Sequence, residues 1–404
     1  MIMNSTKENL NLYLCGPTVY NDVHIGNLRP IIVFDFLISI WEFFGQKVNF
    51  LHNITDIDDK IIEKSINLQI NEAELANNYF QEYLKILEKF NVKSPTKIIK
   101  ITDAIDKIIN YISLLEKKGA TYFDNRGDLI FDTSKFKDYG SISSQKIEFL
   151  LQNNTNRRSE NDFVLWKKTT RGQLFESPFG KGRPGWHTEC AALIFDYFKG
   201  EQIDIHGGGQ DLIFPHHENE NAQHFILRGE ELAKKWLRVG IINLNGKKMS
   251  KSEGNIFLAK DFCKKNNPDV LRNIFLTTNL KSPIDLTEKL LENHRNIIKN
   301  YRKSYFDFLV NPGETNWEKV KEILNFFSKN DFSRGNFLIS ELLRKKENAT
   351  LAQVFKVLRF NFAKQKLGNE DKLDLKNWHQ FLEEKKYKKA DEIREKLWKK
   401  FIFS

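Results

Sequence analysis

The sequence of 404 residues predicts an α/β protein with a parallel sheet, an inserted segment and an all-α helical bundle at its C-terminal end. Three observations lead to this prediction. Short apolar runs alternate with helical patterns as far as Phe90, the alternation stops near Val92 and resumes near Gln202, and no strand-like run follows Thr287. Alternating strands and helices form parallel, doubly wound sheets, and a chain of this length usually holds two or three domains.

The N-terminal part reads as two strands, each followed by a helix. The apolar run at residues 12–15 predicts a short strand, and residues 16–18 predict a turn that leads into a helix over 27–44. Residues 48–51 predict a second strand, and apolar residues at helical spacing predict one long helix over 58–90. This order is that of a Rossmann-like domain.

The middle of the chain interrupts this pattern. A helix is predicted over residues 104–117, a turn-rich alternating stretch follows at 122–132, and residues 152–161 are polar. The sheet resumes with apolar alternation at 202–206.

A glycine loop is then predicted at 207–209, followed by a helix that opens at Pro215, because proline suits the first helical position. Beyond Thr287 the periodicity is helical throughout. The basic stretch 385–400 belongs to a last helix whose apolar stripe contains Ala390, Ile393, Leu397 and Phe401.

These patterns divide the chain into five parts. We expect the first half of a Rossmann-like domain at 1–92, an inserted connective segment at 93–181, the second half of that domain at 182–240, a connecting region at 241–290 and a helical bundle at 291–404.

Composition limits the classes of function. The 63 Lys and Arg exceed the 53 Asp and Glu by a net charge of +10, which favours a polyanionic partner, although the general richness in Lys could equally reflect coding composition. Three cysteines are too few for a disulfide framework, and their odd number would leave one cysteine unpaired. With no apolar run of membrane-spanning length and no secretory signal, we expect a cytoplasmic protein without a membrane partner.

Two motifs suggest a nucleotide site. His24, Gly26 and Asn27 stand between a predicted strand and the start of a helix, where free backbone N–H groups and the positive end of the dipole attract phosphate. Residues 247–255 (KKMSKSEGN) form a basic, hydroxyl-rich loop whose ammonium groups can neutralise a triphosphate as it breaks.

Together these motifs resemble the two signatures of class I aminoacyl-tRNA synthetases, His-Ile-Gly-His and Lys-Met-Ser-Lys-Ser. The second is intact at residues 248–252, and the first departs at its last position, where Asn27 replaces histidine. The resemblance implies that His24 and Asn27 contact the phosphates of ATP, and that Lys248 and Lys251 contact the departing pyrophosphate.

A third set of residues suggests a metal. Cys15, Cys190, His216 and Glu220 supply two thiols, an imidazole and a carboxylate, which can complete a tetrahedral zinc shell. Since His216 and Glu220 are four residues apart, a helix would place both on one face.

The segments around these residues resemble the cysteinyl-tRNA synthetase family over most of residues 11–290. They are CGPTVY at 15–20, NITDIDDK at 53–60, DFVLWK at 162–167, GRPGWHTEC at 182–190 and DIHGGGQDLIFPHHENE at 204–220. The resemblance implies that Cys15, Cys190, His216 and Glu220 bind one zinc ion per chain. It also implies a site for cysteine and ATP that includes Gly16, Thr18, Gly26, Thr55, Trp186, His206, Gly208, Asp211 and Lys251, and leaves Cys263 as a packing residue.

Zinc suits this substrate because a hydrophobic pocket separates near-isosteres such as cysteine and serine by only ~1–3 kcal/mol. A zinc ion prefers a thiolate to a hydroxyl and favours its deprotonated form. The resemblance implies an attack of the cysteine carboxylate on the α-phosphate of ATP, with Mg²⁺ bound to the nucleotide, and then transfer of cysteine to the 2′-hydroxyl of the terminal ribose of tRNA(Cys).

The bundle is expected to contact tRNA phosphates through Arg295, Lys299, Arg302 and the basic stretch 385–400, unless that stretch is only a solvated helix face. The C-terminal region is shorter than in many members of the family, and we expect a monomer. Two alternatives remain: a ligase that passes cysteine to an amino sugar such as glucosaminyl-inositol, and a catalytically inactive paralogue that only binds RNA.

Overall fold

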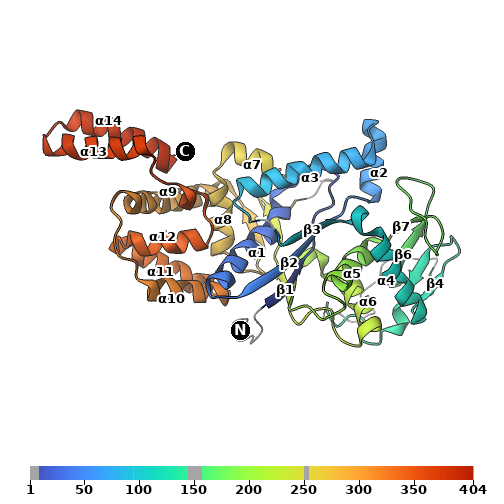
Figure 1. Ribbon diagram of the computed structural model, residues 1–404. Helices are drawn as coiled ribbons and strands as arrows, with labels where there is room; N and C mark the ends of the chain where they lie inside the picture. The colour runs from blue at the N-terminus through green and yellow to red at the C-terminus, as the bar shows by residue number, and fades with distance from the viewer. Residues whose placement is uncertain (1–8, 94, 144–156, 250–253, 404) are drawn as a thin grey trace.

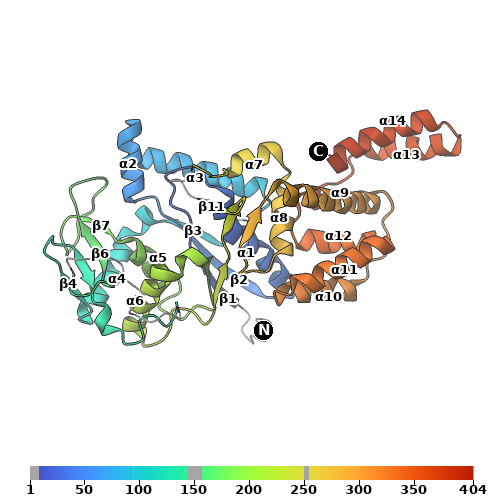
Figure 2. The same ribbon diagram turned by 180° about the vertical axis from the view of Figure 1, so that it is seen from behind.

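The computed structural model describes residues 9–93, 95–143, 157–249 and 254–403. The molecule is elongated (Figures 1 and 2). A central parallel sheet lies between an inserted α/β unit on one side and a helical bundle on the other, and a two-helix hairpin extends from the far end of the bundle. The predicted α/β fold with a helical C-terminal region is confirmed.

The central sheet has five strands in the order β3-β2-β1-β8-β9, and every neighbouring pair is parallel. Because carboxyl ends of parallel strands meet at one edge, the loops after β1, β2 and β8 come together there. The strands are β1 (Asn9–Leu14), β2 (Lys47–Ile54), β3 (Lys97–Lys100), β8 (Ile205–Gly209) and β9 (Trp236–Val239).

Helix α1 (Ile25–Phe43) connects β1 to β2 and lies between the sheet and the bundle (Figure 1). It is apolar on nearly all sides, as expected for a helix covered on both faces. One hydrophobic core runs from β1 through α1 into the bundle.

The prediction of one long helix over residues 58–90 is wrong. The chain forms α2 (Asp59–Leu68) and α3 (Glu72–Lys89), separated at Gln69, whose φ of 55° is left-handed. The sequence explains this break. The Asn71 side chain accepts hydrogen bonds from the backbone N–H groups of Ala73 and Glu74, and it therefore caps the start of a new helix, α3.

Two predictions near the second half of the sheet are also wrong. Residues 207–209 are not a loop but the end of β8, paired with both β1 and β9. The helix does not open at Pro215, because Phe214 is non-helical and a short irregular turn over Ile213–His217 precedes α6 (Glu218–Arg228).

The inserted unit has its own antiparallel sheet, and its hydrophobic residues belong to a second core that also contains Tyr13 and Leu51 of the central sheet. Helices α4 and α5 pack against each other there, and β3, although it falls within residues 93–181, pairs with β2 of the central sheet. Within residues 93–181 the further elements are η1 (Ile101–Ala104), α4 (Ile105–Lys117), β4 (Thr121–Phe123), β5 (Leu129–Phe131) and β6 (Phe163–Lys168). Beyond residue 181, β7 (Gly182–Pro184) completes the antiparallel sheet and α5 (Trp186–Tyr197) follows it.

A small sheet connects the central sheet to the bundle. Its strands are β10 (Ile242–Leu244), β11 (Lys247–Lys248) and β12 (Ile284–Leu286), and the helices between them are α7 (Ala259–Lys265) and α8 (Pro268–Thr277). Cys263 on α7 is partly buried against the main core, so the packing role predicted for it is confirmed.

The C-terminal region is helical throughout its described part, as predicted. The bundle contains α9 (Glu288–Val310), α10 (Trp317–Ser328), α11 (Phe332–Lys345) and α12 (Asn348–Val357). The hairpin consists of α13 (Asn369–Glu383) and α14 (Tyr387–Trp398), and a final turn, Lys399–Phe403, docks it on α9. The predicted stripe is buried at Ala390, Leu397 and Phe401.

Within the described ranges, no helix combines the length and the apolar character that a membrane crossing requires.

Candidate active site

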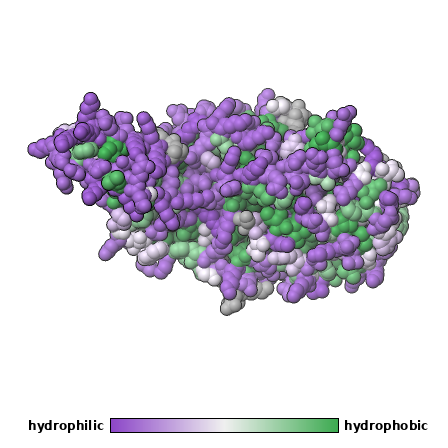
Figure 3. All heavy atoms as spheres, turned by 45° about the horizontal axis from the view of Figure 1, so that its top comes forward, coloured by the Kyte–Doolittle hydropathy of each residue, from purple (hydrophilic) through white to green (hydrophobic). Residues whose placement is uncertain are grey.

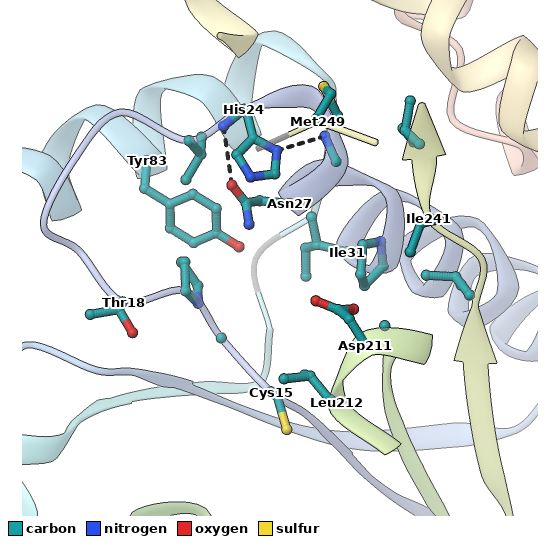
Figure 4. Close-up of a pocket in the computed structure, with 18 of the residues that line it drawn as sticks. Cys15, Thr18, His24, Asn27, Ile31, Tyr83, Asp211, Leu212, Ile241 and Met249 are labelled. Carbon is teal, nitrogen blue, oxygen red and sulfur yellow. Dashed lines mark hydrogen bonds between the residues drawn. The ribbon is translucent and has the colours of Figure 1, made fainter. Parts of the chain in front are cut away.

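A cavity of about 380 Å³ opens at the carboxyl edge of the central sheet (Figure 4). Its walls come from the loop between β1 and α1, the first turns of α1, the end of β8 and the segment around β10 and β11. Cys15 lies at one end of it and His24 and Asn27 lie at the other. A single cavity therefore joins the predicted metal site to the predicted nucleotide site.

The predicted metal-ligating residues converge although they come from four segments. One possible ligand atom from each of Cys15, Cys190, His216 and Glu220 lies within 4.8 Å of the others. The Nε2 atom of His216 is 3.3 Å from Glu220 Oε1, and the Sγ atom of Cys15 is 3.9 Å from the same oxygen. Cys190, His216 and Glu220 are buried.

The site is strongly polarised. Burial raises the pKa of the Cys15 thiol well above its usual value, and so does its hydrogen bond with Cys190. Burial also raises the pKa of Cys190, but the Cys15 hydrogen bond and the charge of His216 outweigh burial and lower it to about 7. His206 and His216 overcome the effect of burial on Glu220 and hold its pKa well below the usual range.

The donor set fits a zinc ion. Two sulfurs, an imidazole nitrogen and a carboxylate oxygen are the ligand types zinc prefers, and four of them complete a tetrahedron. In addition, within the described part of the chain the buried Nδ1 atom of His206 has no hydrogen-bond partner, and the only polar contact of Glu220 Oε2 is the ion pair with His206 Nε2. A buried carboxylate without full hydrogen bonding is unfavourable unless a cation compensates it.

A second grouping competes for the same ligands. Cys15 and Glu220 also lie within 4.8 Å of nitrogen atoms of His206 and His217. Sequence reasoning missed His217, which is next to His216 and carries no spacing signal of its own. Since the first grouping offers a second thiol, it suits zinc better.

Two of the predicted cysteine-pocket residues, Trp186 and His206, contact this cluster. The Trp186 ring stacks on the His216 ring with 4.4 Å between centroids, and 42% of Trp186 is exposed. His206 is fully buried, and its Nε2 atom is 3.0 Å from Glu220 Oε2. Thr18 and Thr55 form a parallel bridge that extends the pairing of β1 and β2, and the Thr55 hydroxyl donates to Glu189.

Two of the predicted glycines have a steric reason. A Cβ atom on Gly16 would lie 1.7 Å from the backbone oxygen of Asn53, and one on Gly208 would lie 2.8 Å from His217 Nε2. Only glycine permits such close approach. Asp211, in the turn after β8, lines the cavity and points into it (Figure 4).

His24 and Asn27 cap helix α1 together. The Nδ1 atom of His24 accepts a hydrogen bond from Gly26 N at 3.1 Å, and the side-chain oxygen of Asn27 accepts one from His24 N at 3.1 Å (Figure 4). This reciprocal arrangement is a capping box, in which two backbone groups at a helix start are satisfied by each other's side chains. Asn27 therefore has a structural role that sequence reasoning missed.

The second signature is described only in part. Lys248 in β11 is exposed, and both Lys248 and Met249 line the cavity. Lys251 lies outside the described residues. The segment after the loop is fixed to the first signature, because His24 pairs with Leu258 and Asp22 forms a 2.6 Å ion pair with Lys260.

Two further cavity residues were absent from the sequence prediction. His52 at the end of β2 and Tyr83 in α3 are both buried and line the cavity, and they are hydrogen-bonded to each other. Neither belongs to a motif with a recognisable spacing.

The family model of the class I (C) tRNA synthetase catalytic domain matches residues 1–296. The chain is also 57% identical over 403 residues to the cysteine–tRNA ligase of Mesomycoplasma hyopneumoniae strain J, covering 99% of both chains. The chain belongs to the cysteinyl-tRNA synthetase family. It is accordingly an enzyme, a cysteine–tRNA ligase of class I.

More distant comparisons agree with this assignment. The cysteine–tRNA ligase of Mesoplasma florum is 41% identical and covers 99% of this chain and 97% of its own. Methionyl-tRNA synthetase of Mycobacterium tuberculosis, solved with methionyl-adenylate, aligns with a TM-score of 0.67 over 89% of this chain and 93% of its own, at 14% identity. At that identity the structural likeness shows only that this synthetase has a class I fold.

Proposed function

We propose that this synthetase activates cysteine with ATP as cysteinyl-adenylate and transfers the cysteine to tRNA(Cys). The observation that carries the proposal is the single cavity with the Cys15 cluster at one end and the capped start of α1 at the other. A thiol held at the first end and a phosphate held at the second bring a carboxylate and an α-phosphate together between them. Such positioning accounts for much of the rate of an adenylation step.

Cys15, Cys190, His216 and Glu220 would hold one zinc ion. When bound, the ion would select a thiolate over a hydroxyl and so distinguish cysteine from serine. The ring of Trp186 orients His216 by stacking on it. Because Gly16 and Gly208 have no side chain, Asn53 and His217 can pack directly against the backbone at these two positions. Thr18, Thr55, His206 and Asp211 complete the proposed cysteine and ATP pocket.

His24 is suited to bind phosphate as a neutral donor. Because its Nδ1 atom accepts from Gly26 N, the proton of the neutral ring is on Nε2, which can donate to an anion. The helix start beside it contributes backbone N–H groups, and Gly26 allows the nucleotide to approach the backbone. Mg²⁺ would accompany the triphosphate.

Lys248 and Lys251 are proposed to stabilise the departing pyrophosphate. Lysine suits this task, since its compact charge on a flexible stem can follow a moving anion. We predict that Lys251→Ala slows cysteine-dependent pyrophosphate exchange by the equivalent of about 3 kcal/mol while zinc content stays constant. Unchanged exchange in this variant would remove Lys251 from the mechanism.

The bundle is proposed to contact the tRNA, but not through every residue predicted for it. Arg302 is buried, and its Nε atom donates to the backbone oxygen of Phe401, so it docks the hairpin instead. Arg295 bonds Asn266 and Glu288, which leaves less of its charge for a phosphate. Lys299 is exposed.

The division of the chain into residues 1–92, 93–181, 182–240, 241–290 and 291–404 remains our proposal for its functional parts. A cytoplasmic location and a monomeric state remain predictions. The comparisons do not favour transfer of cysteine to an amino sugar or a catalytically inactive paralogue.

Zinc content and cysteine activation should change together. We predict that the purified synthetase retains one zinc ion per chain after desalting, and that Cys190→Ser lowers zinc content and cysteine-dependent pyrophosphate exchange in parallel. Cys263→Ser is the matched control, since Cys263 lies on α7 in the core that contains α1, away from the ligand cluster. Elemental analysis of each variant beside the exchange assay provides the test, and a fully active, metal-free protein would contradict the proposal.

A further inference from the structure

His52 and Tyr83 form a buried hydrogen-bonded pair in the wall of the active-site cavity. His52 comes from the end of β2 and Tyr83 from the middle of α3, and their exposed fractions are 1% and 2%. Both residues line the same cavity as Cys15 and His24. No role for them has been assigned so far in the proposed reaction.

The direction of the hydrogen bonds in this pair follows from its partners. His52 Nδ1 is 2.8 Å from the backbone oxygen of Leu14, and because a carbonyl oxygen can only accept, the ring proton is on Nδ1. Burial lowers the pKa of His52 to about 4, so the ring is neutral near pH 7 and Nε2 carries a lone pair. At 3.0 Å from Nε2, the Tyr83 hydroxyl must be the donor.

The Tyr83 oxygen is consequently presented to the cavity as an acceptor. A phenol has one proton, and His52 uses it, which leaves the oxygen lone pairs for another donor. In Figure 4 the hydroxyl group of Tyr83 points from the cavity wall toward the space beside Asn27, between Thr18 and Ile31. A hydrogen bond made there by a bound molecule would be nearly shielded from water, because both residues are buried.

We propose that Tyr83, oriented by His52, binds a reactant of the synthetase by accepting a hydrogen bond from one of its O–H or N–H groups. The inference rests on the proposed function, since only a molecule that extends from the Cys15 cluster to His24 passes this wall. Two reactants offer such donors, namely the ribose hydroxyls of ATP and the ammonium group of cysteine. His52 acts as a positioning residue, because it contacts the reactant only through Tyr83.

Tyr83→Phe removes the acceptor and keeps the ring. In cysteine-dependent pyrophosphate exchange we expect the KM of one substrate, ATP or cysteine, to rise on the order of two- to tenfold, as for one hydrogen bond, while the KM of the other stays constant. Tyr79→Phe is the matched control. It removes a hydroxyl one turn earlier in α3 that accepts from Lys64 at 2.7 Å and does not line the cavity.

Substrate analogues identify the donor. 2′-Deoxy-ATP and 3′-deoxy-ATP lack one ribose hydroxyl each, and 3-mercaptopropionate, used as a competitive inhibitor, is cysteine without its amino group. We expect one of these analogues to bind equally well to the wild type and to Tyr83→Phe, because it lacks the group that donates to Tyr83. His52→Phe should raise the same KM as Tyr83→Phe, but less, and it serves as the second variant if Tyr83→Phe does not fold.

The results separate this inference from the proposed function. If the wild type shows no cysteine-dependent exchange, the proposed function fails and the inference with it. If the wild type is active but both KM values of Tyr83→Phe match those of Tyr79→Phe, only the inference is refuted. Equal weakening of every analogue and every parent substrate would also refute it, since that is the effect of a purely structural hydroxyl.

Discussion

Asn27 is the residue at which this chain departs from the usual first signature of its class, and the structure gives it a definite task. Its side-chain oxygen accepts from the backbone N–H of His24 and closes the capping box of α1. An asparagine amide supplies this acceptor and also a donor, so the same side chain can cap the helix and face a phosphate.

Substitutions at Asn27 should separate these two tasks. Asn27→Ala removes the cap, and we expect it to cost about 1 kcal/mol of stability and to slow pyrophosphate exchange. Asn27→Asp keeps the acceptor and suits a helix start, so stability should be retained, while its negative charge should raise the KM of ATP. Thermal unfolding and exchange kinetics of both variants provide the check; equal stability of Asn27→Ala and the wild type would contradict the capping role.

The sequence could name the donor cluster because Cys15, Cys190, His216 and Glu220 each lie in a segment that resembles the family. The structure brings these four together as that resemblance implies. His217, His52 and Tyr83 could not be named in the same way. Their importance depends on which strand and helix meet at the cavity, and no residue spacing along the chain encodes that meeting.

At the scale of elements, periodicity identified strands and helices but not their ends. The apolar spacing over residues 58–90 continues across the break between α2 and α3, so the pattern alone predicts one helix. The signal that was overlooked is local: Asn71 is a preferred capping residue, and Glu72 and Glu74 place acidic side chains in the first turn of α3. The glycines at 207–209 predicted a loop, but they belong to strand β8. Glycine is needed in this strand because Phe34 and His217 pack closely against its backbone.

The hairpin of α13 and α14 stands away from the body in both ribbon views, and its surface is mostly hydrophilic (Figures 1, 2 and 3). Its lysines are of two kinds. Lys396 is paired with Glu370 and Asp374, and Lys400 with Asp371. In contrast, Lys388, Lys389 and Lys399 are exposed and form no salt bridge within the described part of the chain.

This difference predicts which charges bind tRNA. Replacing Lys388, Lys389 and Lys399 by Gln should weaken tRNA binding. The slope of the logarithm of the binding constant against the logarithm of the salt concentration should become shallower by ~0.7–0.9 for each phosphate that is no longer neutralised. Cysteine activation should remain normal, because no residue of α13 or α14 lines the cavity, and the hairpin stands away from the central sheet in Figure 1. The measurement is the tRNA dissociation constant across a range of salt concentrations.

Lys396→Gln is the control for this experiment, since its charge is already neutralised by Glu370 and Asp374 and should change the slope little. An unchanged slope in the triple variant would mean that the hairpin is a solvated surface. A truncation before Gly368 would remove the whole hairpin. A truncation at Lys385 would leave α13 without Leu397 of α14 and Phe401 of the following turn, which dock the hairpin.

At the scale of the whole molecule, a buried ion cluster joins the catalytic part to the bundle. Asp35 on α1 is 3.0 Å from Arg272 on α8 and also contacts Arg359, which follows α12. Arg359 reaches Glu42 at the end of α1 as well, at 3.0 Å. Arg272 additionally donates to the backbone oxygens of Phe90 and Leu358, so segments distant in sequence are tied to the helix that begins with His24.

Breaking this cluster should destabilise the molecule as a unit. Removing one partner leaves a buried charge uncompensated, so we expect Asp35→Ala to cost about 3–5 kcal/mol, because Asp35 and Arg272 are almost completely buried. Glu42→Ala should cost far less, at most about 1 kcal/mol, since Glu42 is partly exposed and its ion pairs with Arg359 and Lys93 lie at the edge of the cluster. Denaturant unfolding of the two variants, followed by probes in the catalytic part and in the bundle, provides the measurement. We expect both probes to report one transition at a lower denaturant concentration than in the wild type, which would show that the cluster stabilises the two parts as one cooperative unit. Coincident transitions at wild-type stability would show instead that the continuous hydrophobic core around α1 is sufficient.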